Sequence, residues 1–249
     1  MRRKNRVLRW SVIVALGGFL FGFDTAVISG VEQSIQEIFR LNSFLHGFTI
    51  ASALIGTVIG ALTAGKPADK YGRRFLLFII AALYSVSAIG SATAPNVGAF
   101  ILFRFMGGLA VGASSVAGPM YISEISPAAI RGRMTALFQF NVILGILIAY
   151  LSNYLLRDTG NEPWRYMMGA EAVPAVAFFL LLFLVPRSPR FLVKKFRLEE
   201  AATVLQKTGE IEIDREIEEI RQSLLEGRNS NTKLFTRSYM FPVSIAFLV

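Results

Sequence analysis

The sequence contains no cysteine and only one histidine among its 249 residues. Without cysteine the chain has no disulfide framework, no thiolate zinc site and no cysteine nucleophile. The histidine, His46, borders an apolar stretch and stands alone, whereas a zinc site usually takes three or four ligands. We therefore interpret it as an interfacial polar residue and expect neither a metal nor a cofactor. Charged residues are also scarce, at 17% compared with about 25% in ordinary globular chains.

Apolar residues replace the missing charge, at 53% of the chain with a mean hydropathy of +0.52. A helix needs about 20 mostly apolar residues to cross the hydrocarbon core of a bilayer. Six stretches meet this requirement, at residues 7–29, 45–65, 75–94, 97–121, 134–156 and 165–186, and a seventh begins near Met240 and is cut off at Val249. The pattern predicts an all-α, multi-pass membrane protein.

The net charge of +9 follows the predicted spans. Most lysines and arginines fall at residues 1–9, in the second and fourth connections and after the sixth span, and basic residues favour the cytoplasmic side. We therefore predict a cytoplasmic amino terminus in the plasma (inner) membrane, and attribute the positive charge to topology rather than to nucleic-acid binding. The expected domains are a six-span bundle at 1–186, a linker at 187–238 and the start of a seventh span at 239–249.

The linker segment mixes acidic and basic residues with apolar ones at helical spacing. We interpret residues 190–233 as two short amphipathic helices on the cytoplasmic surface, separated near Gly209; a solvated linker is the alternative. Within the spans, glycines recur four residues apart, which lets helix backbones approach closely. These pairs are Gly18/Gly22, Gly56/Gly60 and Gly108/Gly112.

Three charged residues lie inside predicted spans, where charge is costly and usually functional. At 1.5 Å per residue, Asp24 and Arg104 both lie roughly 10 Å below the same membrane face, so the two can pair. Such a pair is either a proton-coupling site or a static structural ion pair, and the residues alone leave both open. Glu171 is placed near the outer interface, with a packing or hydrogen-bonding role.

The second and third spans are joined by a tight basic turn, GKPADKYGRR at 65–74. Gly72 permits a positive φ angle, Asp69 can cap a helix start, and Arg73 and Arg74 can reach carboxylates or lipid phosphates. Generic anchoring by positive charge is the plainer interpretation of such a turn.

This turn resembles the signature loop of the major facilitator superfamily, and further segments resemble its sugar porter branch. They are GFDTAVISG at 22–30, RFMGG at 104–108, PMYISEISP at 119–127, RG at 131–132, PWR at 163–165 and PRSPR at 186–190. The resemblance implies the amino-terminal six-helix bundle of the major facilitator fold, a cytoplasmic helical linker and the start of a seventh span.

The resemblance also implies roles for individual residues. Asp24 and Arg104 match the proton-coupling pair of sugar symporters, with the proton as coupling ion. Gln139 matches a glutamine that binds sugar hydroxyls, and Phe21 an aromatic that lines the same site. A cytoplasmic gating network, which holds the two halves together when the site faces outward, is implied for Asp69, Gly72, Arg73, Arg74, Glu124 and Arg131.

Two departures from the family pattern stand out. Arg187 occupies the position of a glutamate, so a cation stands where the network expects an anion. The chain also stops inside the seventh of twelve expected spans, so the carboxy-terminal half is missing. The prediction is proton symport of a monosaccharide, a pentose or hexose, by alternating access, with the fragment inactive alone. A degenerate half-transporter or sugar sensor that assembles with another membrane chain is the alternative; without an HExxH or GxSxG motif, we expect no enzyme.

Overall fold

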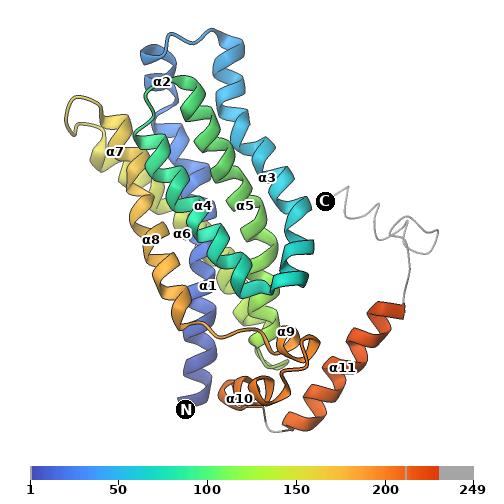
Figure 1. The fold of residues 1–249 in the computed structure, drawn as a ribbon. Coiled ribbons are helices and arrows are strands. Elements are labelled where there is room, and N and C mark those ends of the chain that lie inside the picture. The colour runs from blue at the N-terminus through green and yellow to red at the C-terminus, as the bar shows by residue number, and fades with distance from the viewer. Residues whose placement is uncertain (1, 211, 230–249) are drawn as a thin grey trace.

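The computed structural model describes residues 2–210 and 212–229, and within them every regular element is helical. Elements α1 to α8 form a long bundle, and α9 to α11 lie at the end that carries the amino terminus (Figure 1). In chain order they are α1 Arg2–Val27, η1 Ile28–Gly30, α2 Glu32–Ile38, α3 Ser43–Tyr71, α4 Arg73–Ala92, α5 Val97–Ile125, α6 Arg131–Leu156, α7 Pro163–Ala170, α8 Ala172–Leu181, η2 Leu182–Leu184, α9 Pro189–Lys194, α10 Leu198–Thr208 and α11 Ile213–Asn229.

Six helical segments are long and apolar enough to cross a membrane, which confirms the six predicted spans. They are Arg6–Gly30, Ser43–Tyr71, Arg73–Ala92, Val97–Ile125, Arg131–Leu156 and Pro163–Leu184. Asparagine side chains cap two of them: Asn42 accepts from the Leu45 amide at 2.8 Å, and Asn96 from the Ala99 amide at 2.9 Å. The predicted start of a seventh span, near Met240, lies outside the described residues.

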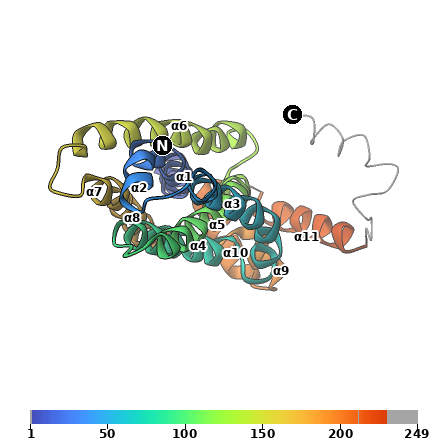
Figure 2. The same cartoon turned by 90° about the horizontal axis from the view of Figure 1, so that it is seen from above.

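The spans pack in a pattern that relates the first three to the last three. The first span, α1, packs mainly against the fifth, α6, and the second, α3, packs mainly against the fourth, α5. The third, α4, packs against the sixth, α7–α8, and also against α5. Exchanging the two sets of three spans reproduces the same pairs, as expected for a bundle built from two three-helix repeats. Figure 2 shows α6 along one edge of the bundle, beside α1.

Glycine makes the closest of these contacts possible, as the glycine spacing predicted. A Cβ atom added at Gly112 of α5 would lie 1.9 Å from the carbonyl oxygen of Thr57 in α3. One added at Gly22 of α1 would lie 2.0 Å from the carbonyl oxygen of Val142 in α6. The two principal helix pairs therefore meet backbone against backbone, with no room for a side chain between them.

Outside these contacts the bundle presents apolar side chains to its surroundings. A surface of this kind suits lipid or another helical bundle rather than water. Large exposed apolar side chains on α3, α6 and α8 include Leu54, Val58, Leu62, Phe140, Ile143, Leu147, Val173 and Leu180.

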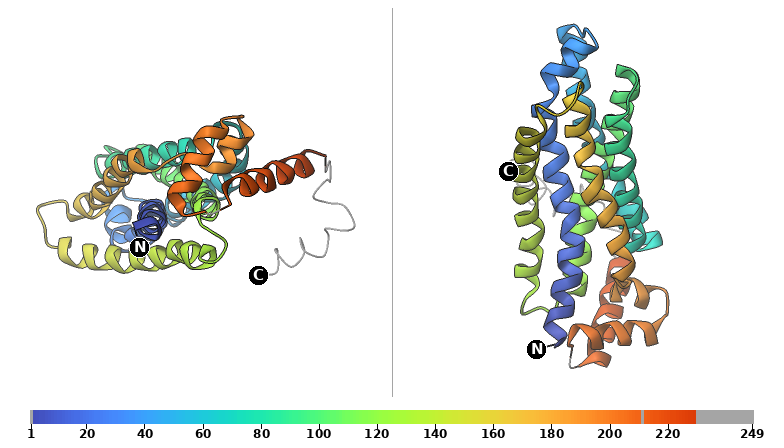
Figure 3. Two further views of the ribbon diagram at one scale, coloured as in Figure 1. Left: turned by 90° about the horizontal axis from the view of Figure 1, so that it is seen from below. Right: turned by 90° about the vertical axis from the view of Figure 1, so that its left-hand side faces the viewer.

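The linker contains the two predicted helices, α10 and α11, and a short helix, α9, that was not predicted. Gly209 ends α10 with a φ angle of 98°, in the left-handed conformation that glycine favours at helix ends. Leu192, Val193 and Val204 form a small core with the inner face of α11. Seen from below, α9 and α10 lie under the bundle and α11 extends away from it (Figure 3).

Candidate functional site

A charged pair joins α1 and α5 inside the bundle. Arg104 Nη1 donates to Asp24 Oδ1 at 2.5 Å, and Arg104 Nη2 donates to the backbone carbonyl of Asp24 at 3.3 Å. Each residue is 2% exposed. The pairing expected from their matching depths is therefore present, and each charge lowers the cost of burying the other.

Gly107 leaves space for the Asp24 carboxylate, because glycine has no side chain. It lies on α5 nearly one turn from Arg104, and a Cβ added there would be 3.2 Å from Asp24 Oδ1. The same Cβ would be 2.5 Å from the hydroxyl oxygen of Ser87, which donates to the Phe103 carbonyl of α5 at 2.7 Å. The acid is thus enclosed by α1, α4 and α5, and Gly107 leaves space for its carboxylate beside α5.

Glu171 is buried beside the Asp24–Arg104 pair, a contact that the sequence interpretation did not predict. It is 1% exposed, at the junction of α7 and α8, and it interacts electrostatically with both Asp24 and Arg104. Pro174 explains the junction, because proline has no amide hydrogen to donate to the Ala170 carbonyl and its ring crowds that group. The break in the sixth span adds a second carboxylate to the buried pair, which sequence reasoning missed.

The resulting cluster contains two carboxylates and one guanidinium. With both acids ionised it would carry one negative charge without a counterion, and an isolated buried charge is very costly. Oε1 of Glu171 and Nε of Arg104 have no hydrogen-bond partner within the described part of the chain. The cluster is electrically balanced when it holds one proton, so proton uptake and release are chemistry that this geometry can perform.

The two expected sugar-binding residues lie on neighbouring helices. Phe21, on α1, is half-buried, and Gln139, on α6, is exposed. Both belong to the α1–α6 crossing, where a Cβ added at Gly18 would lie 2.6 Å from the carbonyl oxygen of Phe138. Gln139 and Phe21 therefore lie at similar levels, with Asp24 about one turn further along α1.

At the end of the bundle that carries α9 to α11, three of the expected network residues meet. Arg73 pairs with Asp69 at 2.8 Å and with Glu124 at 2.9 Å, while the Ser188 hydroxyl also donates to Glu124. The Arg73–Glu124 pair is shielded from water, since its side chains are 6% and 11% exposed, whereas Asp69 is 57% exposed and meets the solvent. They tie the α3–α4 connection to the end of α5 and to the start of α9.

The α3–α4 connection consists of one residue, Gly72, with φ 93° and ψ 150°. This conformation is almost confined to glycine, as the sequence predicted for this position. The expectation that Asp69 caps a helix start is wrong, because α3 continues past Pro67 to Tyr71 and α4 starts at Arg73. Asp69 instead lies in the last turn of α3 and pairs across the connection.

Two other expected members lie outside these ion pairs. Arg74 Nη2 donates to the Phe183 carbonyl at 3.2 Å. Arg131 is exposed at the first residue of α6 and interacts electrostatically with Glu216 of α11. Within the described ranges, no group of three or more His, Cys, Asp and Glu residues could hold a metal ion.

Six membrane-spanning helices around an internal cluster of ionisable groups define a polytopic membrane protein with chemistry inside the bilayer. A family model described as "Sugar (and other) transporter" matches residues 10–249. The chain belongs to this sugar porter family of the major facilitator superfamily, whose members are transporters and not enzymes.

Several relatives are similar over most of the chain. A glucose transport protein of Synechocystis is 41% identical over 229 residues, or 88% of this chain and 49% of the relative. The D-xylose-proton symporter of Escherichia coli K12 is 37% identical over 269 residues, or 94% and 54%. The structure of the proton:xylose symporter XylE bound to 6-bromo-6-deoxy-D-glucose superposes with a TM-score of 0.87, at 36% identity, over 92% and 55%. The chain spans about half the length of the curated relatives it matches.

Proposed function

We propose that this chain forms the proton-binding half of a transporter that couples monosaccharide uptake to proton entry. The observation that carries the proposal is the buried cluster of Asp24, Arg104 and Glu171, which is neutral only with one proton bound. Relatives named as proton symporters of xylose make a pentose or hexose the expected substrate. A static ion pair needs no second buried acid, so Glu171 favours the coupling role over the structural one.

Proton binding would act on the bundle by changing which carboxylate Arg104 pairs with. When Asp24 takes the proton, its attraction for the guanidinium weakens, and Glu171 remains as a charged acid nearby. Arg104 would then shift toward the sixth span, which loosens the contact between α1 and α5. A ligand-dependent change of this kind biases an equilibrium between two states of the bundle.

Sugar would bind where the α1–α6 crossing opens toward the second half. Gln139 is exposed there and has both a donor and an acceptor for hydroxyl groups, and Phe21 offers an apolar surface for a sugar ring. Asp69, Gly72, Arg73, Arg74, Glu124 and Arg131 would form the network that closes one side, which alternating access requires. A cytoplasmic amino terminus in the plasma membrane, with a carboxy-terminal half like that of its relatives as partner, completes the proposal.

The test uses proteoliposomes that contain this chain with the carboxy-terminal half of the E. coli D-xylose-proton symporter. D-xylose and D-glucose uptake is measured with and without an inward proton gradient, together with counterflow. Asp24→Asn should abolish gradient-driven accumulation and spare counterflow, because exchange needs no net proton movement. Asp158→Asn removes a charge from an exposed side chain and should change neither.

Two outcomes would contradict the proposal. One is gradient-driven accumulation that persists in the Asp24→Asn variant, since the proton would then bind elsewhere. The other is uptake by the 249-residue chain alone, since the sugar site is proposed to need both halves. Both measurements use the same lipids and the same labelled sugars, with both halves in the vesicles for the first and this chain alone for the second.

A further inference from the structure

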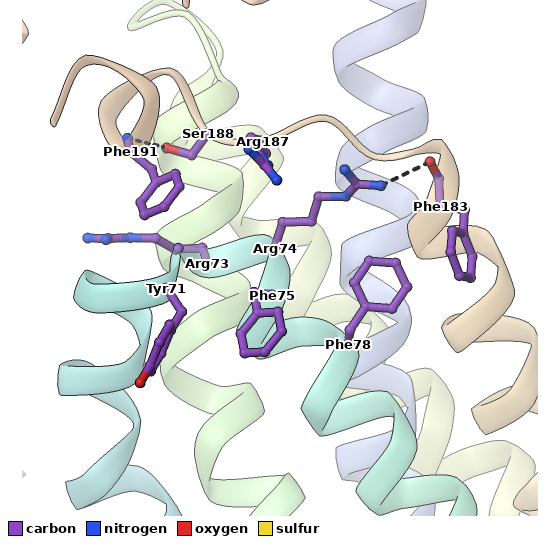
Figure 4. Close-up of a pocket in the computed structure, with 10 residues that line it drawn as sticks. Tyr71, Arg73, Arg74, Phe75, Phe78, Phe183, Arg187, Ser188 and Phe191 are labelled. Carbon is purple, nitrogen blue, oxygen red and sulfur yellow. Dashed lines mark hydrogen bonds between the residues drawn. The ribbon is translucent and has the colours of Figure 1, made fainter. Parts of the chain in front are cut away.

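A cationic pocket lies at the end of the bundle that carries α9 to α11. Its cavity is about 220 Å³, several times the roughly 30 Å³ that one water occupies. Figure 4 shows side chains from α3, α4, the end of the sixth span and α9 surrounding it. The lining residues are Tyr71, Gly72, Arg73, Arg74, Phe75, Phe78, Phe183, Arg187, Ser188 and Phe191.

Two of its three arginines have no carboxylate partner among the described residues. Arg73 is neutralised by Asp69 and Glu124. Neither Arg74 nor Arg187 forms an ion pair with any residue that the structure describes, and the two repel each other electrostatically. The Nε atom of Arg74 is buried without a hydrogen-bond partner in this part of the chain. An anion in the pocket would relieve both the repulsion and the unsatisfied donor.

The backbone holds Arg187 over the pocket. On one side of it, the Tyr121 hydroxyl donates to the Pro186 carbonyl at 2.7 Å. On the other side, the Ser188 hydroxyl donates to Glu124. Because both neighbouring residues are hydrogen-bonded to α5, the backbone at Arg187 cannot move away from Arg74 to relieve the repulsion.

The pocket also lies at a membrane boundary. The second span ends at Tyr71, the third begins at Arg73 and the sixth ends at Leu184, and all three residues are beside or in the pocket wall. Phe75 and Phe183 are 51% and 61% exposed, which gives the pocket an apolar edge on its lipid side. Cationic groups above exposed aromatic rings match a phosphate group with hydrocarbon below it.

We propose that Arg74 and Arg187 bind a phosphate group in this pocket, supplied by the headgroup of an anionic phospholipid. Guanidinium groups offer paired N–H donors that fit two phosphate oxygens at once. The aromatic edge favours a phosphate that carries acyl chains over free phosphate. The site is separate from the buried proton cluster and does not depend on the proposed transport activity.

The test compares phosphatidylglycerol, phosphatidylcholine and inorganic phosphate as ligands of the purified 249-residue chain in detergent. Binding is read as retained lipid in native mass spectrometry and as thermal stabilisation. Arg187→Glu and Arg187→Gln remove the cation at an exposed position, so folding should be unaffected. Arg133→Glu is the control for Arg187→Glu. It makes the same charge reversal at another exposed arginine, which lies near the start of α6 and outside the pocket.

We expect phosphatidylglycerol to be retained by the wild type and by Arg133→Glu, and to bind about fivefold more weakly to Arg187→Gln. Arg187→Glu should lose more, because its carboxylate can pair with Arg74. Saturable binding of inorganic phosphate that depends on Arg187, without lipid retention, would support a phosphate site with a soluble source. Equal binding of all ligands by the wild type and both Arg187 variants would overturn the proposal.

Discussion

The charge balance of the buried cluster gives a prediction about stability that does not require transport. Asp24→Asn leaves Glu171 to balance Arg104, and Glu171→Gln leaves the Asp24–Arg104 pair, which is 2.5 Å apart. Each single variant keeps one acid for one base. The double variant leaves the guanidinium alone at 2% exposure, so the two substitutions should be far from additive.

The magnitudes follow from the cost of an uncompensated buried charge. Each single substitution should lower the free energy of unfolding by less than about 1.5 kcal/mol, since the cluster keeps a neutral pair. The double variant should lose about 3–5 kcal/mol, the range measured when one partner of a buried pair is removed. For a chain of this size the double variant should therefore melt roughly 10 °C lower than the wild type.

Thermal unfolding in detergent can be followed by the near-ultraviolet circular dichroism of Trp164. This side chain is 2% exposed, and its ring lies edge-on to Phe39 and Phe100 at 6.0 and 6.2 Å, so its signal reports the packed bundle. Asp158→Asn serves as the control for loss of an acid. If the double variant loses no more stability than the sum of the two singles, Glu171 does not compensate Arg104 and the charge balance proposed here is incorrect.

Three further variants test the packing of the bundle and the linker. Gly112→Ala should lower the free energy of unfolding by about 1–3 kcal/mol or more, because the new methyl group meets the Thr57 carbonyl oxygen at 1.9 Å. The control, Gly65→Ala, places its methyl group in open space and should raise the free energy of unfolding by about 0.5–1 kcal/mol. Equal effects of the two substitutions in thermal unfolding would refute the close contact. Burial, with Glu210 and Glu219 nearby, raises the pKa of Glu216, so the ionised form is disfavoured and the stability of α11 should rise as pH falls through that pKa. Glu216→Gln should remove this pH dependence in hydrogen exchange, and an unchanged dependence would place the titrating group elsewhere.

The parts of the site that follow from regular helix geometry could be predicted from the sequence. The constant rise per residue placed Asp24 and Arg104 at one depth, and the structure pairs them. Glycines four apart predicted the close crossings for the same reason. A positive φ angle at Gly72 was predictable because few other residues could occupy so tight a turn.

The position of Glu171 beside the buried ion pair could not be obtained from depth alone, because depth does not say which way a side chain faces. The estimate started from Trp164 and Arg165 as interfacial residues, but Trp164 packs inside the bundle. Counted from Pro163, the first residue of α7, Glu171 lies about 12 Å along the helix. Pro174 was the one local signal, since it marks the break that lets the sixth span place a carboxylate among its neighbours.

The helix cap assigned to Asp69 failed for a different reason. Gly65 and Pro67 both suggest that α3 ends before Asp69, yet α3 continues to Tyr71. Contacts with the rest of the bundle outweigh the local preference of these residues, as they commonly do in packed helices. The ion pairs of Arg73 then depend on positions that only the folded chain defines.

The single-residue connection at Gly72 also fixes how α4 is rotated about its own axis. With 3.6 residues in each turn, one inserted residue would rotate α4 by about 100° relative to α3. Leu77, Ile80 and Tyr84, now fully buried, would turn away from the centre of the bundle. Because no loop is present to absorb the error, the length of this connection is as strict a requirement as the identity of the glycine.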